Sequence, residues 1–308
     1  MKKNKNLIIF GGNRLLENGP IGDLTKYLKK KKIIYVLITD PNHLKKKTAN
    51  FNNFKTSIKG VKYFSFKKLD DKKVIRLIDD NTFGLSINSI WKFSKELIKK
   101  FDGRLFNYHA ANLPEERGAG NLTWKILQGN FKKNTINIHR VDKEFDTGDI
   151  VASKKLNLIN KNLLPKNYLQ IIAKEEKLFL SKFVNKIMKD EKLTLIKQKG
   201  GQYYWPKLNA DNDGKIDWSW SVRDITSFIK GFSHPYNGAF SFININKIKI
   251  FNASFILKKK FHPFQNGLIF RENKTEIFVA HSTGYLILQK KNLNANKIQK
   301  SYIGKRFK

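Results

Sequence analysis

The first 190 residues alternate short apolar runs with longer segments of helical period. Runs of strand length cover residues 7–10, 33–39, 61–66, 84–88, 103–108, 135–141 and 150–158. Apolar residues that recur every three to four positions predict helices with one buried face. Such segments cover residues 23–31, 71–79, 120–128 and 168–189. Alternating strands and helices are typical of a mostly parallel sheet covered on both faces. We therefore predict an α/β, Rossmann-like domain here.

The pattern changes after about residue 190. The pairs Gly200-Gly201 and Trp205-Pro206 indicate a linker. One further helix is predicted over residues 225–232. Short alternating runs then cover residues 239–245, 247–253, 267–270, 275–280 and 285–288. Such runs predict a smaller β-rich domain, an OB-like barrel closed by one helix. The predicted division is a domain over 1–190, a linker over 191–205 and a second domain over 206–308.

The first predicted strand ends in a glycine-rich turn, Gly11-Gly12-Asn13-Arg14. The next helix is expected to begin at Asp23 as its N-cap. A glycine-rich first turn of a βαβ unit is a common place for phosphate groups. The turn lacks the full Gly-x-Gly-x-x-Gly pattern, and the P-loop pattern is also missing, so neither a dinucleotide nor a P-loop nucleotide is implied. Residues 40–59 are polar and rich in Lys and Asn, which predicts a surface loop.

The composition excludes several kinds of site. The chain has no cysteine, so disulfides, thiolate metal ligands and a cysteine nucleophile are excluded. The six histidines lack the spacing of a zinc site, so we expect no metal. No apolar run is long enough to cross a bilayer, and the first run is too short for a signal peptide. These features fit a cytoplasmic protein.

The formal net charge of +36 is extreme for a chain of 308 residues. It has two interpretations. A basic surface attracts nucleic acid or an anionic membrane. The alternative is compositional bias, because only eight of the 61 basic residues are Arg, which phosphate- and base-binding surfaces favour, and the lysines are scattered. We favour bias. Either way, the field attracts anionic substrates.

Two polar residues stand at the end of the strand predicted over residues 103–108. Residues i and i+2 of a strand point the same way, so Asn107 and His109 project side by side. Ligands of open α/β sheets bind at the carboxyl ends of the strands. Asp146 follows in a turn before Gly148. An amide, an imidazole and a carboxylate aimed at one point are suited to acyl transfer.

These residues form an ordered set that resembles the formyltransferases using 10-formyltetrahydrofolate. The set comprises Asn107-x-His109, Leu113-Pro114, Arg117-Gly118 and Asp146-x-Gly148. The second half is also similar, because residues 203–208 and 214–218 resemble the entry to the family's smaller C-terminal domain. The resemblance covers most of the chain and is clearest over residues 84–150 and 203–255.

The resemblance implies a role for each residue. Asn107 donates a hydrogen bond to the oxygen of the tetrahedral intermediate, and His109 relays a proton from the attacking amine to N10 of the folate. Asp146 raises the pKa of His109 and holds its orientation; Asp149 is the rival carboxylate. The implied folate-binding residues are Ser86, Ile87, Trp91, Val141, Asp142 and Glu144. The implied acceptor-binding residues are Gly12, Asn13, Arg14, Arg117 and Gly118.

Some of these residues also have structural interpretations. Ile87 and Trp91 could belong to the core, since aromatic and aliphatic side chains bury well in either role. Arg117 could form a salt bridge within its loop, although its geometry suits a phosphate. We favour substrate contact for Arg117.

The acceptor of the formyl group separates several hypotheses. Our leading hypothesis is a nucleotide-linked amino-deoxysugar, such as a dTDP-4-amino-4,6-dideoxyhexose, used for surface polysaccharide, O-antigen or lipopolysaccharide. Methionyl-tRNA is the alternative, although residues 39–47 lack the Gly-Arg-Gly pattern of the tRNA enzymes' inserted loop. A glycinamide ribonucleotide enzyme, a formyl-folate hydrolase and a non-catalytic nucleic-acid binder are less favoured. The resemblance also suggests a homodimer.

Overall fold

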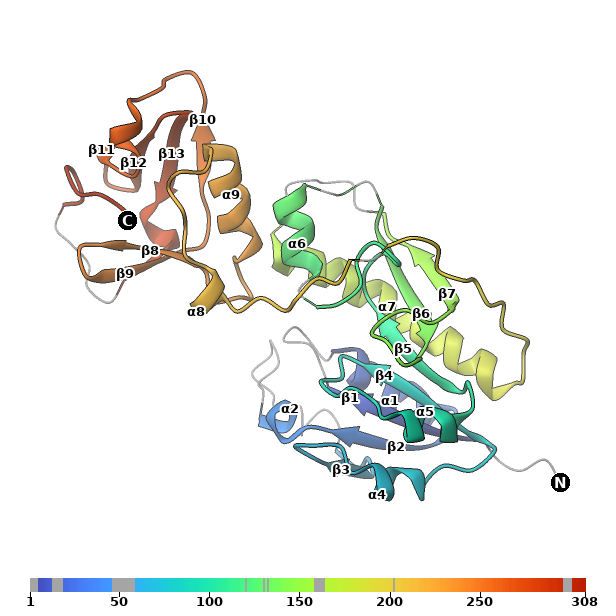
Figure 1. Cartoon of the computed structure of the whole chain (residues 1–308). Coiled ribbons are helices and arrows are strands. Elements are labelled where there is room, and N and C mark those ends of the chain that lie inside the picture. The colour runs from blue at the N-terminus through green and yellow to red at the C-terminus, as the bar shows by residue number, and fades with distance from the viewer. Residues whose placement is uncertain are drawn as a thin grey trace. The chain divides into compact units, whose positions relative to one another are not determined.

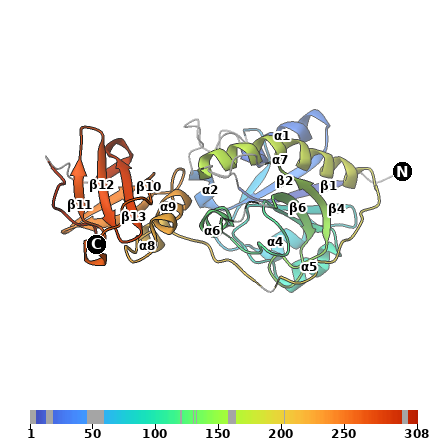
Figure 2. The same cartoon turned by 90° about the horizontal axis from the view of Figure 1, so that it is seen from above.

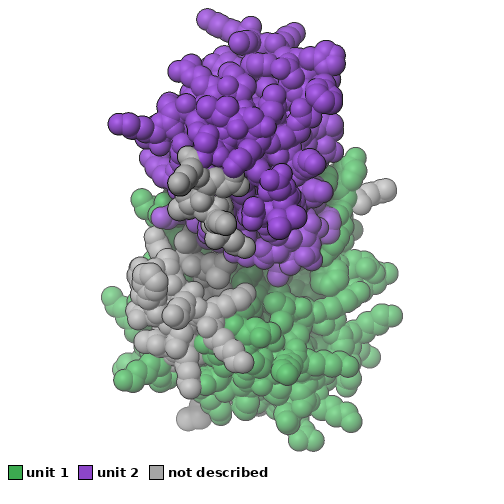
Figure 3. All heavy atoms as spheres, turned by 90° about the vertical axis from the view of Figure 1, so that its left-hand side faces the viewer, with its two compact units in different colours: residues 1–118, 133–158, 169–205 green, residues 119–132, 159–168, 206–308 purple. Residues whose placement is uncertain are grey.

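The structure of the protein is a computed structural model. It describes residues 5–12, 19–45, 59–119, 121–129, 131, 133–157, 164–201, 203–295 and 301–308. The chain forms two compact units (Figure 3). Unit 1 comprises residues 1–118, 133–158 and 169–205, and unit 2 comprises residues 119–132, 159–168 and 206–308. The domain boundaries predicted from the sequence stay a prediction.

A seven-stranded sheet with the order β3-β2-β1-β4-β5-β6-β7 forms the centre of unit 1 (Figure 1). Its strands are β3 (Tyr63–Ser65), β2 (Ile34–Thr39), β1 (Asn6–Gly11), β4 (Thr82–Ile87), β5 (Leu105–His109), β6 (Thr135–Arg140) and β7 (Ile150–Lys155). The first five are parallel, whereas β6 and β7 are antiparallel to their neighbours. The chain passes from β1 outward to β3 and returns beyond β1 to β4. The predicted mostly parallel α/β sheet is confirmed.

Helices cover both faces of this sheet (Figure 2). Helices α1 (Gly19–Lys30) and α7 (Pro165–Met188) lie on one face, and α4 (Asp71–Ile75) and α5 (Lys95–Phe101) on the other. The alternation of side chains along β1 explains the two layers. Leu7 and Ile9 belong to the core on the α1 face, while Ile8 and Phe10 belong to the core beneath α4 and α5. A strand buried on both faces reads as a continuous apolar run.

Three local predictions need correction. Helix α1 begins at Gly19, so Asp23 lies inside it rather than at its N-cap; Pro20 is tolerated in the first turn. The predicted loop over residues 40–59 begins with a short helix, α2 (Pro41–Lys45), and residues 46–58 lie outside the described residues. Helix α5 was not predicted, although Ser94 is a standard N-cap that accepts a 3.1 Å hydrogen bond from the Leu97 N–H.

Unit 2 contains two antiparallel sheets and three α-helices among its described residues. One sheet has the order β10-β13-β12-β11 and the other β14-β9-β8. The strands are β8 (Ala239–Ile243), β9 (Asn246–Ile250), β10 (Ser254–Ile256), β11 (Ile269–Glu272), β12 (Glu276–His281), β13 (Gly284–Gln289) and β14 (Leu293–Ala295). The helices are α6 (Asn121–Gln128), α8 (Ala210–Asp213) and α9 (Val222–Gly231). The prediction of a second, β-rich part is confirmed.

Residues near the C-terminus link the two sheets of unit 2. Phe307 forms a bridge with Ile243 of the three-stranded sheet, and Arg306 forms one with Leu268, next to β11 of the four-stranded sheet. Phe307 is 1% exposed and stacks on Trp218, with 5.2 Å between ring centroids. The last residues are therefore part of this core. Two short 3₁₀ helices, Pro263–Gln265 and Lys290–Asn292, join strands of the unit.

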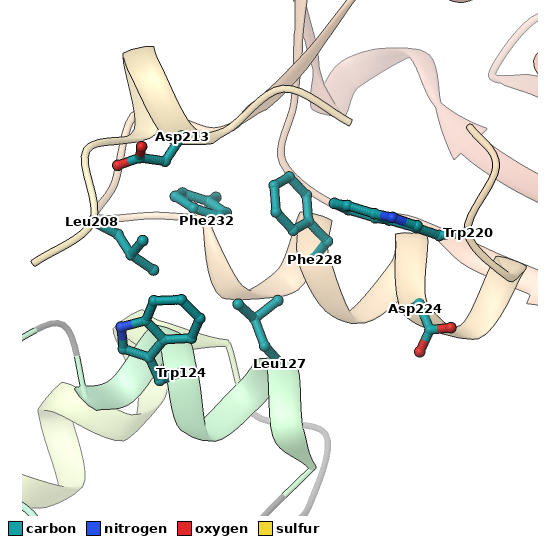
Figure 4. A pocket seen from close by; sticks show the side chains of 8 residues that line it. All are labelled: Trp124, Leu127, Leu208, Asp213, Trp220, Asp224, Phe228 and Phe232. Carbon is teal, nitrogen blue, oxygen red and sulfur yellow. The ribbon is translucent and has the colours of Figure 1, made fainter. Parts of the chain in front are cut away.

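Helices α6 and α9 of unit 2 border a cavity of about 430 Å³ (Figure 4). Its lining comprises Trp124, Leu127, Leu208, Asp213, Trp220, Asp224, Phe228 and Phe232. The side chain of Thr123 ties α6 to α9 by a 3.0 Å hydrogen bond to the Gly231 carbonyl. None of the residues predicted for the site lines this cavity. In the described part of the chain, no helix is both long and apolar enough to cross a membrane.

Candidate active site

Strand β5 places Asn107 and His109 on one side of the sheet. Leu105, two residues earlier, packs into the core beneath α4 and α5, so Asn107 and His109 continue that face. Phe106 and Tyr108 point into the opposite core. The predicted side-by-side arrangement is therefore confirmed. His109 lies inside the strand rather than in the loop after it, because it still pairs with β6.

The carboxylate of Asp146 lies at the centre of a polar cluster. Its Oδ1 accepts a 3.2 Å hydrogen bond from Asn107 Nδ2 and lies 3.2 Å from Nε2 of His139. Its Oδ2 accepts a 2.9 Å hydrogen bond from the Gly118 N–H and lies 3.7 Å from Nδ1 of His109. The three residues of the predicted triple, Asn107, His109 and Asp146, are thus brought together.

His109 is almost completely enclosed. Its side chain is 8% exposed, and its Nε2 lies 2.7 Å from the backbone carbonyl of Glu116. Burial lowers the pKa of His109 more than the charge of Asp146 raises it. The predicted effect of Asp146, which raises the pKa of His109, is therefore confirmed, but burial outweighs it, and the pKa lies below its ordinary value. The lowered pKa favours the neutral ring at physiological pH.

Asp146 is held in its ionised form. Burial by itself raises the pKa of this carboxyl, but interactions with His109 and His139 and the Gly118 N–H outweigh that effect. The pKa of Asp146 therefore lies well below its usual value. A permanently charged carboxylate beside a neutral imidazole is suited to stabilise the imidazolium that forms when His109 takes up a proton.

The backbone around Asp146 is fixed in an unusual conformation. Asp146 has φ 57°, in the left-handed region that non-glycine residues rarely adopt. Gln198 holds this turn, because its Nε2 donates to the carbonyls of Asp146 at 2.9 Å and Gly148 at 2.8 Å. Arg117 in turn holds Gln198, since Nε and Nη2 donate to Gln198 Oε1 at 3.0 and 2.8 Å.

Two glycines of the motif allow close approaches of the backbone. A Cβ on Gly148 would lie 2.1 Å from the Arg140 carbonyl oxygen, so any side chain there would push the turn away from β6. A Cβ on Gly118 would lie 2.3 Å from the Trp205 carbonyl oxygen, and Gly118 also has φ 98°. Both glycines therefore bring the loops that surround Asp146 together.

The residues predicted to bind folate lie at the end of β4 and in the turn before Asp146. Ser86 and Ile87 are buried in β4, and the side chain of Ile87 belongs to the core on the α1 face. Trp91 and Val141 are partly buried against the opposite core. Asp142 Oδ1 accepts hydrogen bonds within its own turn, from Thr147 Oγ1 and the Glu144 N–H. Glu144 is exposed. Their contact with a folate stays a prediction.

The residues predicted to bind the acceptor differ in their surroundings in the structure. Gly12 is buried, and its N–H donates to the Ile87 carbonyl at 3.2 Å. Asn13 and Arg14 lie outside the described residues. The Gly118 N–H is used by Asp146. The Arg117 guanidinium uses three of its five N–H groups within the protein, the third bonding to the Gly201 carbonyl at 2.7 Å. Contact between Arg117 and a substrate stays a prediction, and it would use the remaining two N–H groups of the guanidinium.

The sequence interpretation missed two residues of this cluster. His139 is 2% exposed and lies directly opposite Asn107 in the β5–β6 register. The signal for His139 was a polar residue on the alternating strand predicted over residues 135–141. Gln198 is far from the motifs in sequence, and nothing in its neighbourhood predicts a role. In the described part of the chain, no group of three or more His, Cys, Asp or Glu residues could hold a metal.

Known proteins match this chain over most of its length. Family models of the formyl transferase domain and of the formyl transferase C-terminal domain match residues 8–184 and 210–302. The methionyl-tRNA formyltransferase of Finegoldia magna is 24% identical over 269 residues, which are 80% of this chain and 81% of that protein.

Two solved structures are similar over nearly the whole chain. The fold resembles WlaRD, a sugar 3N-formyl transferase crystallised with dTDP and 5-N-formyl-THF, with a TM-score of 0.66 and 18% identity. The similarity covers 96% of this chain and 99% of WlaRD. An N-formyltransferase of Helicobacter canadensis, in complex with folinic acid and dTDP-3-aminofucose, has a TM-score of 0.68 and 16% identity, covering 92% and 99%. Since the domain model alone spans more than half of the chain, this protein belongs to the formyl transferase family.

Proposed function

We propose that the protein transfers the formyl group of 10-formyltetrahydrofolate to the amino group of a nucleotide-linked amino-deoxysugar. The observation that supports formyl transfer most directly is the cluster of Asn107, His109 and the ionised Asp146 at the end of β5. The acceptor rests on the similarity to two sugar formyltransferases, which spans 92–96% of this chain. A dTDP-4-amino-4,6-dideoxyhexose is our leading candidate, and surface polysaccharide its destination.

In this proposal the reaction begins with attack by the neutral amine. Its nitrogen bonds to the formyl carbon, and the carbonyl oxygen becomes an oxyanion. His109, neutral because of its lowered pKa, accepts the proton that the attacking nitrogen loses. The resulting imidazolium faces the Asp146 carboxylate. The proton then passes to N10, the bond from the formyl carbon to N10 breaks, and tetrahydrofolate leaves.

Asn107 is the proposed donor to the oxyanion. In the structure its Nδ2 faces Asp146 Oδ1 and His139 Nε2, each at 3.2 Å. One N–H of Asn107 donates to Asp146 Oδ1, and His139 Nε2 accepts the other only when that ring nitrogen carries no hydrogen. Donation to the reacting oxygen therefore requires Asn107 to turn an N–H from these neighbours toward the substrate.

The alternative acceptor is methionyl-tRNA. The relative from Finegoldia magna, whose name gives it that activity, supports this hypothesis, and so does the net charge of +36. The same three residues would perform the chemistry, because the step at the formyl carbon is identical. The acceptor would then bind through the basic surface and be sensitive to salt.

A formyl-transfer assay distinguishes the acceptors. The purified protein would be given 10-formyltetrahydrofolate with each of several thymidine- and uridine-diphosphate 3-amino and 4-amino deoxysugars, or with methionyl-tRNA. Release of tetrahydrofolate and the mass of the formylated product are the readouts. Turnover of one sugar nucleotide without turnover of tRNA supports the proposal. Turnover of tRNA alone overturns it, and turnover without any acceptor indicates a hydrolase.

A further inference from the structure

The loop after β5 contains a buried carboxylate that the formyl-transfer mechanism does not use. Glu116 is 7% exposed and Asn112 is 4% exposed, although both are polar. The backbone N–H of Asn112 donates to Glu116 Oε2 at 2.9 Å, and Asn112 Nδ2 donates to Glu116 Oε1 at 3.1 Å. The Glu116 N–H donates back to the Asn112 carbonyl at 2.8 Å. We call this set of bonds the Asn112–Glu116 clamp.

The clamp is attached to the sheet. Asn112 Oδ1 accepts hydrogen bonds from the N–H and hydroxyl of Thr135, at 2.9 and 3.0 Å. Asn112 Nδ2 also donates to the Lys133 carbonyl at 2.8 Å. Thr135 is the first residue of β6. The clamp therefore fixes the loop against the strand that lies beside β5.

The loop in turn fixes His109 through a backbone atom. The Glu116 carbonyl oxygen lies 2.7 Å from Nε2 of His109. A carbonyl can only accept, so Nε2 must carry the hydrogen. In the neutral ring, the lone pair is then on Nδ1, which faces Asp146 Oδ2 at 3.7 Å. Nδ1 is thus the nitrogen that can take up a proton.

We propose that the Asn112–Glu116 clamp sets the tautomer of His109 and thereby selects Nδ1 as the nitrogen that moves the proton. Glu116 and Asn112 are positioning residues, because they act through the Glu116 carbonyl. The proposal rests on formyl transfer at this site but not on the identity of the acceptor.

The adjacent residue provides a matched control. Glu115 lies in the same loop, but its side chain is 49% exposed and contacts only Lys133, at 3.3 Å, among the contacts described for it. Its carbonyl, which accepts from Trp205 Nε1, remains after substitution. Glu115→Ala removes a charge from the same loop without touching the clamp.

The test compares Glu116→Ala with Glu115→Ala by kinetics and by ¹⁵N NMR of histidine-labelled protein. In the unaltered protein, the ¹⁵N shifts should report a single neutral tautomer of His109 with hydrogen on Nε2. Glu116→Ala should give a mixture of tautomers and lower kcat by about 10- to 100-fold, as expected for loss of an orienting contact, with little change in KM. Glu115→Ala should change neither quantity.

Glu116→Gln covers the case in which the alanine variant fails to fold. Its amide oxygen can still accept from the Asn112 N–H but not from Asn112 Nδ2 at the same time, so its kcat should lie between the values of Glu116→Ala and Glu115→Ala.

The proposal would be overturned if His109 of the unaltered protein carried its hydrogen on Nδ1. Loss of kcat in Glu116→Ala with the Nε2 tautomer unchanged would also overturn it, because the role would then be structural only. If the unaltered protein shows no formyl transfer at all, the tautomer measurement still tests the clamp, while the proposed function fails.

Discussion

Asn107 and His139 face each other across two antiparallel strands. They are paired in the β5–β6 register, and Asn107 Nδ2 lies 3.2 Å from His139 Nε2. Both side chains also reach Oδ1 of Asp146, at 3.2 Å each. His139 Nδ1 lies 2.7 Å from the carbonyl of Arg140, which limits rotation of the ring. The amide proposed to meet the oxyanion is therefore oriented by a histidine from a neighbouring strand.

Removing either His109 or Asn107 should abolish most activity while the fold survives. His109→Ala removes the group that moves the proton, and Asn107→Ala removes the donor to the oxyanion. Each role typically accounts for a factor of about 10² to 10⁴ in rate. Initial rates of tetrahydrofolate release measure the loss, and circular dichroism checks the fold. Near-normal turnover in either variant would contradict its assigned role.

Asp146→Asn should lower kcat and move the pH profile in a definite direction. The charge of Asp146 raises the pKa of His109, so its removal lowers that pKa further. The rate should rise with pH as His109 loses its proton. In the unaltered protein, the midpoint of this rise should lie below the ordinary histidine pKa of about 6.5. In the variant, the midpoint should lie at still lower pH.

Asp149→Asn is the control for that measurement. Asp149 follows the same turn, but the contact described for it is made by its backbone carbonyl, which accepts from the Arg140 N–H at 2.9 Å. Its substitution should leave kcat and the pH profile unchanged. If Asp149→Asn moves the profile and Asp146→Asn does not, the carboxylate that tunes His109 is assigned to the wrong residue.

His139→Gln should reduce kcat less than Asn107→Ala does. Glutamine keeps a polar group in the buried position but cannot place both ring contacts, to Asp146 and to the Arg140 carbonyl. A double-mutant cycle with Asn107→Ala should give a coupling energy of about 0.5 to 3 kcal/mol, because residues in one hydrogen-bond network are not additive. Additive effects on kcat would mean that His139 does not orient Asn107.

Gly148→Ala should damage both stability and activity. The added Cβ would meet the Arg140 carbonyl oxygen at 2.1 Å, and that oxygen also contacts His139 Nδ1. Overpacking of this kind typically costs about 1 to 3 kcal/mol of unfolding free energy. The melting temperature and kcat should therefore both fall.

Gly304→Ala is the control substitution, at a glycine where the added Cβ meets no other atom. Gly304 has φ 76°, and nothing lies within 4 Å of an added Cβ. It should lower the melting temperature through backbone strain alone and leave kcat unchanged. If Gly148→Ala behaves in the same way as Gly304→Ala, the close approach of the Asp146 turn to β6 does not matter for catalysis.

Several features of the fold follow from local patterns in the sequence. The apolar runs predicted strands, and the alternation of strands with helices predicted a sheet covered on both faces, as the burial of β1 shows. Asn107 and His109 share a face for the same reason. The boundaries were less predictable. Helix α1 begins at Gly19 and α5 begins after its N-cap Ser94, and the period of the apolar positions marks neither place.

The amino-acid sequence by itself determined that Asn107 and His109 share one face at the end of β5, because strand geometry is local, and its ordered motifs identify the family. Only the tertiary structure decided which residues surround them. His139 and Gln198 reach Asp146 from another strand and a distant segment, and the sequence does not show which residues such segments bring together. The pKa of His109 was also decided there, since burial depends on everything that packs around the ring, and it outweighs the single charge that the sequence suggested.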